Sequence, residues 1–411
     1  MNLAGAEANL SQEPKTGQAM TDWKRKIRIT RFDRVVLGAG LLLVAAAGGL
    51  LWLSQMMVAP PRARLKDSVR PVIGITMRER EPSGLEIRRV ASPAREAGLR
   101  VGDRIVRIDD LRNPTMQQLV GHVREAEAGH RFAIEARRPA GDGESLVLVD
   151  LLADVRPVSP ADEDLPYENV TFDGFGGLKL RGWYIPAPAG SGRSPAVAYG
   201  HGNAADRRQW LPAAAEVHEA GIAQLLFDFA GRGESDGEVI SLGAHESADL
   251  RAALDWLAKR PDVDPRRLGL AGKSMGGVAA ILAAADDPRV RALVLDSPFA
   301  DLRQTVDRAL EERHLPAAIV RPVVFKLAGF RANYDPDTVR PVEAIRRVKA
   351  PALLLHGTAD TVIPASDAEA IRAAAAGPVT YLPLEGIDHN DTRPPEVWDR
   401  VAAYLKGSLG R

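Results

Sequence analysis

Short apolar runs alternate with helical patterns along the second half of the chain, and this alternation constrains the fold more than any other feature. The runs cover residues 196–200, 223–228, 268–272, 292–296, 352–356 and 379–383. Most are continuously apolar, as strands buried on both faces must be. The clearest helical pattern between them covers residues 246–260 and ends at Pro261. From about residue 165 to 411 the pattern therefore predicts an α/β domain, a parallel sheet with crossover helices.

The composition removes several classes of function. Of the 411 residues, 45% are hydrophobic and 26% are charged, as in ordinary folded proteins. The 54 Lys and Arg residues balance the 54 Asp and Glu residues, so the net charge gives no argument for nucleic acid as a partner. The chain has no Cys, which excludes disulfides, thiolate metal sites and a cysteine nucleophile.

The N-terminal region has a basic segment followed by an apolar one. Residues 24–34 hold six Lys or Arg and one Asp, whereas residues 35–58 hold no ionisable side chain. As a helix, the apolar run would be about 36 Å long, enough to cross a hydrocarbon core of about 30 Å. We therefore expect a basic, disordered segment at 1–34 and an uncleaved transmembrane helix at 35–58.

Basic residues on the two sides of the apolar run predict its orientation. Six precede the run, and four follow it in a similar window, namely Arg62, Arg64, Lys66 and Arg70. The bias favours a cytoplasmic N-terminus and an extracytoplasmic, periplasmic C-terminal bulk. The alternatives are a buried helix of a soluble domain, which would keep a polar stripe, and a cleaved signal peptide, whose apolar region is shorter.

A short glycine-flanked serine motif, "GKSMG", follows the apolar run at 268–272. The pattern G-x-S-x-G can present a serine nucleophile, here Ser274, on a sharp strand-to-helix turn, but alone it fits a structural turn equally well. A serine hydroxyl also needs a base and an acid that orients the base. Asp360 and His389 each stand just after a later apolar run. Because the carboxyl ends of parallel strands meet at one edge of a sheet, we expect these three residues to converge.

The remaining polar groups near these turns have other expected roles. The oxyanion hole would use the backbone N–H of Met275 and that of Asn203 or Ala204, which follow an early strand. We expect the other residues to pack, to staple loops or to face solvent, with no chemical role assigned and Lys273 left unexplained. They are His201, Arg232, His356, Asp388 and Asp391.

From about residue 165 to the end, the chain resembles the α/β-hydrolase superfamily. The resemblance rests on "GHGNA", "DFAGRGESDG", "GKSMGG", "DSPFADL", "LLLHGTADTVIP" and "GIDHND", in that order. It is nearest to the serine esterase, acyl-thioesterase and aminopeptidase-like branch. The resemblance implies a mostly parallel eight-stranded sheet with helices on both faces, and it makes Ser274 the nucleophile, His389 the base and Asp360 its orienting acid. It implies a cap at about 300–350 and no metal or organic cofactor.

Residues 70–157 have a different pattern, with short alternating strands and two helical stretches at 92–99 and 115–127. This segment is similar to bacterial PDZ domains, on the strength of "PVIGI" and "SPAREAGLRVGDRIVRIDD". The resemblance implies that Ile73, Gly74 and Ile75 form a loop that receives the C-terminal carboxylate of a peptide or protein. A spacer or an intramolecular regulator of the hydrolase is the alternative role.

Together these features predict a membrane-anchored serine hydrolase that cleaves a carboxylic ester, thioester or amide through an acyl-enzyme on Ser274. A membrane-tethered peptide-binding scaffold with an inactive hydrolase domain is the alternative function. The sequence leaves open which acyl bond is cut and the oligomeric state.

Overall fold

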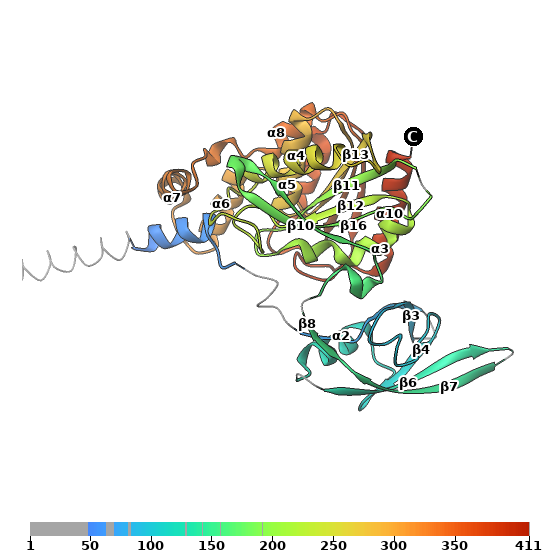
Figure 1. Cartoon of the computed structure of the whole chain (residues 1–411). Coiled ribbons are helices and arrows are strands. Elements are labelled where there is room, and N and C mark those ends of the chain that lie inside the picture. The colour runs from blue at the N-terminus through green and yellow to red at the C-terminus, as the bar shows by residue number, and fades with distance from the viewer. Residues whose placement is uncertain are drawn as a thin grey trace, which may run out of the picture. The chain divides into compact units, whose positions relative to one another are not determined.

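The computed structural model describes residues 48–62, 70–80, 84–127, 130–141, 143–156, 158–190 and 192–410. Its largest element is an eight-stranded sheet (Figure 1) in the order β16-β15-β14-β13-β11-β12-β10-β9. Strands β11 to β16 run parallel, while β10 pairs antiparallel with both β9 and β12. The strands are β9 (Glu168–Asp173), β10 (Lys179–Ile185), β11 (Ser194–Gly200), β12 (Ala223–Phe227), β13 (Val263–Lys273), β14 (Val290–Asp296), β15 (Ala352–Gly357) and β16 (Val379–Leu384).

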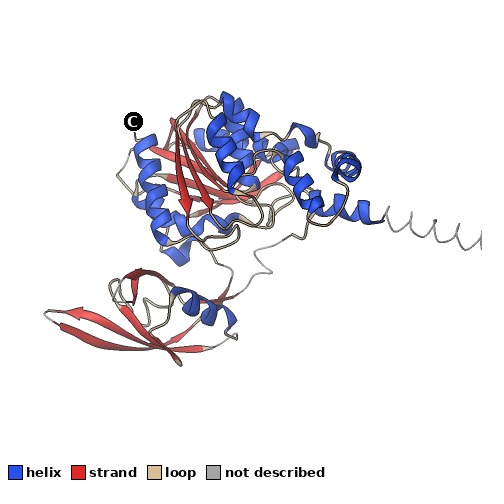
Figure 2. Ribbon diagram, turned by 180° about the vertical axis from the view of Figure 1, so that it is seen from behind, coloured by secondary structure: helices blue, strands red, loops and turns tan. Residues whose placement is uncertain are grey.

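Helices cover both faces of this sheet (Figure 2). One face carries α3 (Leu211–Glu219) and α10 (Pro395–Leu409), and the other carries α4 (Ala244–Ala258), α5 (Met275–Asp286) and α9 (Ala365–Ala374). Each face has its own hydrophobic cluster, and the two clusters share alternate residues of the same strands. For example, Leu270 packs toward α4 and α5, whereas its neighbour Ala271 packs toward α3 and α10. Burial on both sides explains why the central strands read as continuous apolar runs.

The six strands predicted from apolar runs correspond to β11 to β16, and the helix predicted at 246–260 corresponds to α4. The two antiparallel strands β9 and β10 complete the sheet at its other edge. In β9 only Phe172 is buried, so this strand lacks the apolar run that marks the central strands. The domain is thus the predicted α/β type, with a mostly parallel sheet.

The segment between β14 and β15, predicted as a cap, is helical. It contains α6 (Leu302–Glu311), α7 (Ala317–Ala332) and the short α8 (Pro341–Ala344). The apolar residues of α7 divide between two faces. Val324 and Phe325 are buried, whereas Phe330 is 89% exposed. Packing in the core therefore explains only some of the apolar residues of α7.

Residues 70–156 form a smaller β-rich domain. Its sheet has the order β2-β3-β4-β6-β7, with β5 paired to β4, while β1 pairs with β8. Phe132, Ile87 and Leu119 are among the residues of its core. The elements are β1 (Arg70–Val72), β2 (Ile75–Arg80), β3 (Gly84–Val90), β4 (Arg104–Ile108), β5 (Leu111–Arg112), α2 (Met116–Glu125), β6 (Arg131–Ala140), β7 (Gly143–Leu152) and β8 (Asp154–Arg156).

One of the two helices predicted in the small domain is absent. Residues 92–98 form successive turns, whereas the other pattern becomes α2, with Thr115 as its N-cap in a capping box with Gln118. Pro93 stands near the start of the turn segment, and Gly98 ends it with a φ of +99°, so too few residues remain for a helix.

The predicted membrane helix falls largely on residues for which no structure is described. Residues 48–58 are helical, while 1–34 and 35–47 lie outside the described residues. Within the described part of the chain, no helix has both the length and the apolar character that a membrane crossing requires.

Candidate active site

Ser274 occupies a sharp turn between β13 and α5. Its φ of 53° and ψ of −120° are unusual for a residue with a side chain. The Ser274 N–H donates to Asp296 O at the end of β14 (2.7 Å), and the Ser274 carbonyl accepts from Val278 N in the first turn of α5 (3.0 Å). Two regular elements therefore hold a strained residue at the carboxyl edge of the sheet, as a nucleophile elbow requires.

Glycines make this turn possible. A Cβ on Gly276 would lie 2.1 Å from Gly200 O, and a Cβ on Gly272 would lie 2.1 Å from Gly276 O. Backbone from β11, β13 and α5 meets at these positions, so no side chain fits there. Gly202, after β11, lies next to the serine, since a Cβ on Gly202 would be 3.7 Å from Ser274 Cβ.

The structure brings the other two predicted catalytic residues together. Asp360 follows β15 and His389 follows β16, and His389 Nδ1 lies 2.7 Å from Asp360 Oδ2. An ionised carboxylate only accepts hydrogen bonds, so Nδ1 of His389 carries the proton. The lone pair of Nε2 is then free to accept a proton. The predicted acid, Asp360, therefore orients the imidazole ring of the predicted base, His389.

The Asp360 carboxylate is fully buried yet well satisfied. Its Oδ1 accepts from the N–H groups of Val362 (3.0 Å) and Ile363 (2.7 Å), and its Oδ2 accepts from His389. Burial by itself would raise the pKa of Asp360, but these hydrogen bonds to the charged form outweigh it, and the pKa is lowered. Asp360 thus stays ionised beside the His389 ring.

Asp388, expected as a solvated carboxylate, ties the two catalytic loops together. Its Oδ1 accepts from Thr361 N and from His389 N, both at 2.7 Å. The Asp388 N–H donates in turn to Asp391 Oδ2 at 2.8 Å. Hydrogen bonds from Thr361 and His389 lower the pKa of Asp388. Asp388 therefore holds the loop that contains Asp360 and Thr361 at a fixed distance from the loop that contains His389.

Arg393 is a positioning residue that the sequence analysis missed. It is 3% exposed and donates to both carboxylate oxygens of Asp296, at 2.9 and 3.1 Å. It also donates to the carbonyls of Asp388 and Asp391, each at 3.0 Å. Because Asp296 also accepts from Ser274 N, this ion pair links the nucleophile turn to the loop that carries His389. An arginine before a proline carries no sequence signal for such a role.

The predicted oxyanion donors lie on two turns near Ser274. Met275 is the first residue of α5, where an N–H has no partner within the helix. The Gly202 N–H already donates to Gln209 Oε1 (2.7 Å), so the N–H groups of Asn203 and Ala204 remain the candidates on the other turn. The Asn203 side chain accepts from Arg232 Nη2 at 2.8 Å, which holds this turn in place.

Buried polar residues around the site have structural roles. His201 Nε2 accepts from Phe229 N (3.1 Å), and His201 Nδ1 donates to Gly202 O (2.8 Å), while burial lowers the pKa of this histidine. His356 lies 2.9 Å from Ile363 O through Nε2. Arg232 is buried, which lowers its pKa to about 10, and it acts as a loop staple.

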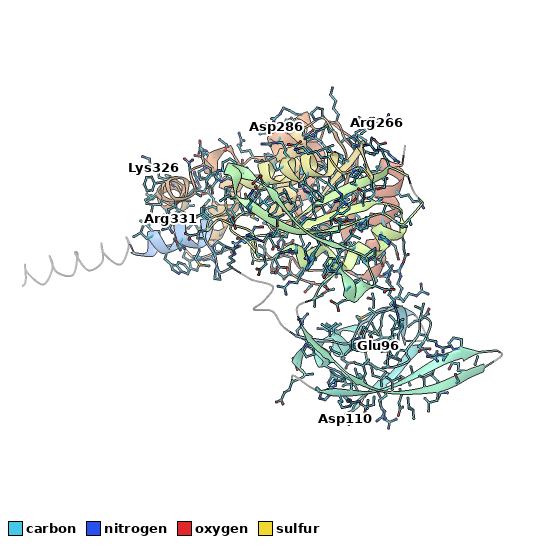
Figure 3. All side chains as sticks on the ribbon, in the orientation of Figure 1. Glu96, Asp110, Arg266, Asp286, Lys326 and Arg331 are labelled. Carbon is cyan, nitrogen blue, oxygen red and sulfur yellow. The ribbon has the colours of Figure 1, made fainter. Side chains whose placement is uncertain are left out.

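A small pocket of about 180 Å³ lies beside the catalytic loops. Burial lowers the pKa of Lys273, which lines this pocket, against the attraction of Asp296. A larger hollow of about 970 Å³ lies at the amino ends of β14 and β15, the end opposite to the catalytic turns, near Arg266 and Asp286 (Figure 3). Of these two cavities, only the small pocket lies at the carboxyl edge of the sheet, where the predicted catalytic residues are. The residues around the small pocket include Gln209, Trp210, Lys273, Asn390, Arg393 and Trp398.

The predicted peptide-binding loop lies between β1 and β2 of the small domain. Gly74 has a φ of +69°, and a Cβ there would lie 2.4 Å from Ser92 O, so the position requires glycine. Ile75 begins β2, which is an edge strand of its sheet, and Ile73 is buried. The Gly74 carbonyl accepts from Ala91 N at 2.8 Å.

Comparisons with known proteins agree with this architecture. Residues 184–317, which include Ser274, match the model of the X-Pro dipeptidyl-peptidase (S15 family). The Pyrococcus furiosus esterase Pf2001 superposes with a TM-score of 0.50 at 25% sequence identity, covering 62% of this chain and 97% of the esterase. This likeness places the C-terminal domain among the α/β-hydrolases.

Two bacterial proteins share this part of the sequence. The Uncharacterized protein Rv2307c of Mycobacterium tuberculosis is 36% identical over 244 residues, which cover 59% of this chain and 79% of that protein. The Uncharacterized protein YfhR of Salmonella typhi is 30% identical over 237 residues, which cover 54% of this chain and 75% of that protein. The chain therefore belongs to the α/β-hydrolase family that includes Rv2307c and YfhR.

Proposed function

We propose that this chain is a serine hydrolase that cleaves a carboxylic ester, thioester or amide through an acyl-enzyme on Ser274. The observation that carries the proposal is the 2.7 Å contact between His389 Nδ1 and the buried Asp360 carboxylate, in loops linked to the strained Ser274 turn. The S15 family match and the esterase likeness of the same domain support hydrolysis.

The proposed acyl transfer has two halves, acylation and deacylation of Ser274. His389 Nε2 accepts the proton of Ser274 Oγ as the oxygen attacks the acyl carbon, and Asp360 stabilises the resulting imidazolium. Collapse of the tetrahedral intermediate expels the alcohol, thiol or amine, which takes the proton from His389. Water then attacks the acyl carbon and gives its proton to His389, the bond from that carbon to Ser274 Oγ breaks, and His389 returns the proton to Ser274 Oγ as the carboxylic acid leaves. Backbone N–H groups of Met275 and of Asn203 or Ala204 would hold the oxyanion.

A fluorophosphonate probe tests the nucleophile. The probe should label the wild-type protein and fail to label Ser274→Ala, because it phosphonylates an activated serine oxygen. Ser145→Ala, which removes an exposed serine of the small domain, is the matched control and should label like wild type. Equal labelling of Ser274→Ala and wild type would rule out Ser274 as the nucleophile.

Asp360→Asn tests the orienting role. The amide cannot stabilise an imidazolium and favours the wrong tautomer, so kcat should fall by about 10⁴ while the fold persists. The substrates would be p-nitrophenyl esters of increasing chain length, acyl thioesters and X-Pro amides. The class with the largest kcat/KM identifies the acyl bond, and activity on none of them would contradict the proposal.

We further propose that residues 35–58 anchor the enzyme in a membrane, with the N-terminus cytoplasmic and the hydrolase periplasmic. The support is the absence of ionisable side chains from residues 35–58 and the basic residues before it. The full chain should sediment with membranes and resist carbonate extraction. Protease added to spheroplasts should digest the hydrolase domain, and its protection would reverse the proposed orientation.

The small domain is proposed to bind the C-terminus of a peptide or protein, as PDZ domains do. The support is the position of β2 at the edge of its sheet, next to the glycine-dependent loop at Gly74. If the hydrolase were an inactive scaffold, Ser274→Ala would keep peptide capture and the substrate panel would show no turnover. Retained capture in a Gly74→Val variant would contradict binding at this loop.

A further inference from the structure

Three side chains of the small domain converge on one point. His122 Nε2 lies 2.8 Å from Asp109 Oδ2, and His130 Nε2 lies 2.9 Å from the same oxygen. The three ligand atoms all lie within 4.8 Å of one another. They come from three elements, namely the turn after β4, the helix α2 and the residue before β6. Asp110, labelled in Figure 3, marks the turn.

We propose that Asp109, His122 and His130 form a binding site for a divalent transition-metal ion, with Zn²⁺ as the best fit. Two imidazoles and one carboxylate are ligands that Zn²⁺ prefers, and water can supply the fourth. His122 and His130 stand 13 and 21 positions after Asp109, unlike the short ligand spacings of common zinc motifs, so the sequence alone predicts no metal site here.

The site is held ready for an ion. Asp109 Oδ1 accepts from Ala133 N at 2.8 Å, so the backbone of β6 fixes the carboxylate and leaves Oδ2 pointing at the two rings. Asp109 has a φ of 48° in its tight turn, and its own N–H donates to Ala133 O at 2.8 Å. Both rings also pack edge-on against Phe132, at centroid distances of 5.9 and 4.5 Å.

The dimensions fit a small cation after a modest opening. Ligand atoms about 2.0 Å from a tetrahedral Zn²⁺ are about 3.3 Å apart, so the two N···O contacts of 2.8 and 2.9 Å must each open by about half an ångström. The side chains are 18%, 32% and 38% exposed for Asp109, His122 and His130, which gives an ion a path and leaves room for water. Arg107, which donates to the Asp109 carbonyl, is itself paired with Glu135 at 2.5 Å.

An ion at this site would connect α2 to the turn after β4 and to β6. Helix α2 contacts β2, the edge strand of the sheet. Binding would therefore stabilise the small domain, since an ion that binds only the folded state raises its melting temperature.

Calorimetric titration of the full-length, chelator-stripped chain with Zn²⁺ tests the proposal. We expect one ion per chain and binding weakened about tenfold or more in each of Asp109→Asn, His122→Gln and His130→Gln. His314→Asn is the matched control, because it removes an exposed histidine outside this domain and Asn tolerates the local φ of 57°. That variant should bind like wild type.

Co²⁺ gives a second readout that needs no variant. Four-coordinate Co²⁺ absorbs strongly in the visible region, and Zn²⁺ should displace that signal from the wild-type chain. Far-UV circular dichroism identifies any variant that fails to fold. If a site variant is unfolded, the Co²⁺ spectrum of the wild-type chain tests the proposal in its place. The proposal is overturned if wild type gives no Co²⁺ band and no Zn²⁺ heat, or if all three site variants bind like His314→Asn.

Discussion

At the scale of single residues, the site depends on backbone strain at Ser274. A side chain at φ 53° and ψ −120° costs about 1–3 kcal/mol, and packing of β13 against α5 maintains it. The hydroxyl of the proposed nucleophile is thus presented at the expense of fold stability.

The strain can be measured by substitution. Ser274→Gly should raise the free energy of unfolding by about 1 kcal/mol, because glycine adopts this backbone conformation without a Cβ. Ser274→Ala keeps the Cβ and should show no such gain, although both variants lose the nucleophile. Urea unfolding of the two variants gives the comparison, and equal stabilities would show that the turn is relaxed.

The position of Gly276 should not tolerate any side chain. Gly276→Ala places a methyl group 2.1 Å from Gly200 O, so β11 or α5 must move. We expect a loss of about 2 kcal/mol or more in unfolding free energy, together with a fall in kcat as Ser274 shifts.

The matched change for Gly276→Ala is Gly407→Ala in α10, where a Cβ would meet nothing within 4 Å. There the stability should rise by about 0.5–1 kcal/mol, since alanine favours a helix. Thermal unfolding distinguishes the two, and a similar effect of both changes would contradict the close approach at Gly276.

At the scale of elements, a buried ion pair between Arg393 and Asp296 holds the Ser274 turn to the loop that carries His389. Arg393→Ala would leave the Asp296 carboxylate buried and unpaired, which should cost about 3–5 kcal/mol. It should also lower kcat, since the loop carrying His389 loses its anchor on β14. Replacing both partners, as in Asp296→Leu with Arg393→Met, should restore much of the stability without restoring kcat. If the single variant were as stable as the double one, the pair would not hold the loops.

The sequence predicts those elements whose residue pattern is local. The parallel strands β11 to β16 are visible as apolar runs because both of their faces are buried, and each catalytic residue follows such a run. Arg393 was missed because its partner Asp296 is 97 positions away in the chain. The helix predicted at 92–99 was wrong because Pro93 and Gly98 favour turns. The antiparallel strand β9 shows too little burial to leave a pattern.

At the scale of the whole molecule, the three proposed catalytic residues belong to one part of the chain. All eight strands of the large sheet, and Ser274, Asp360 and His389, lie within residues 158–410. A protein of these residues alone should fold and hydrolyse p-nitrophenyl esters with the kcat of the full chain. A thermal unfolding scan and ester kinetics would check this. A drop of tenfold or more in kcat would show that the N-terminal part contributes to the chemistry.

The small domain begins and ends with paired strands. Arg70 of β1 is the register partner of Arg156 of β8, and the two strands run antiparallel. The chain thus enters and leaves this domain at one point, so residues 70–156 could be replaced by a short connector without separating the flanking segments. A force that pulls those segments apart would unzip β1 from β8 one hydrogen bond at a time. The pair resists force in this direction less than it would resist shear along the strands. Under tension this two-stranded ladder would yield first, while the six-stranded sheet beyond it carried no load.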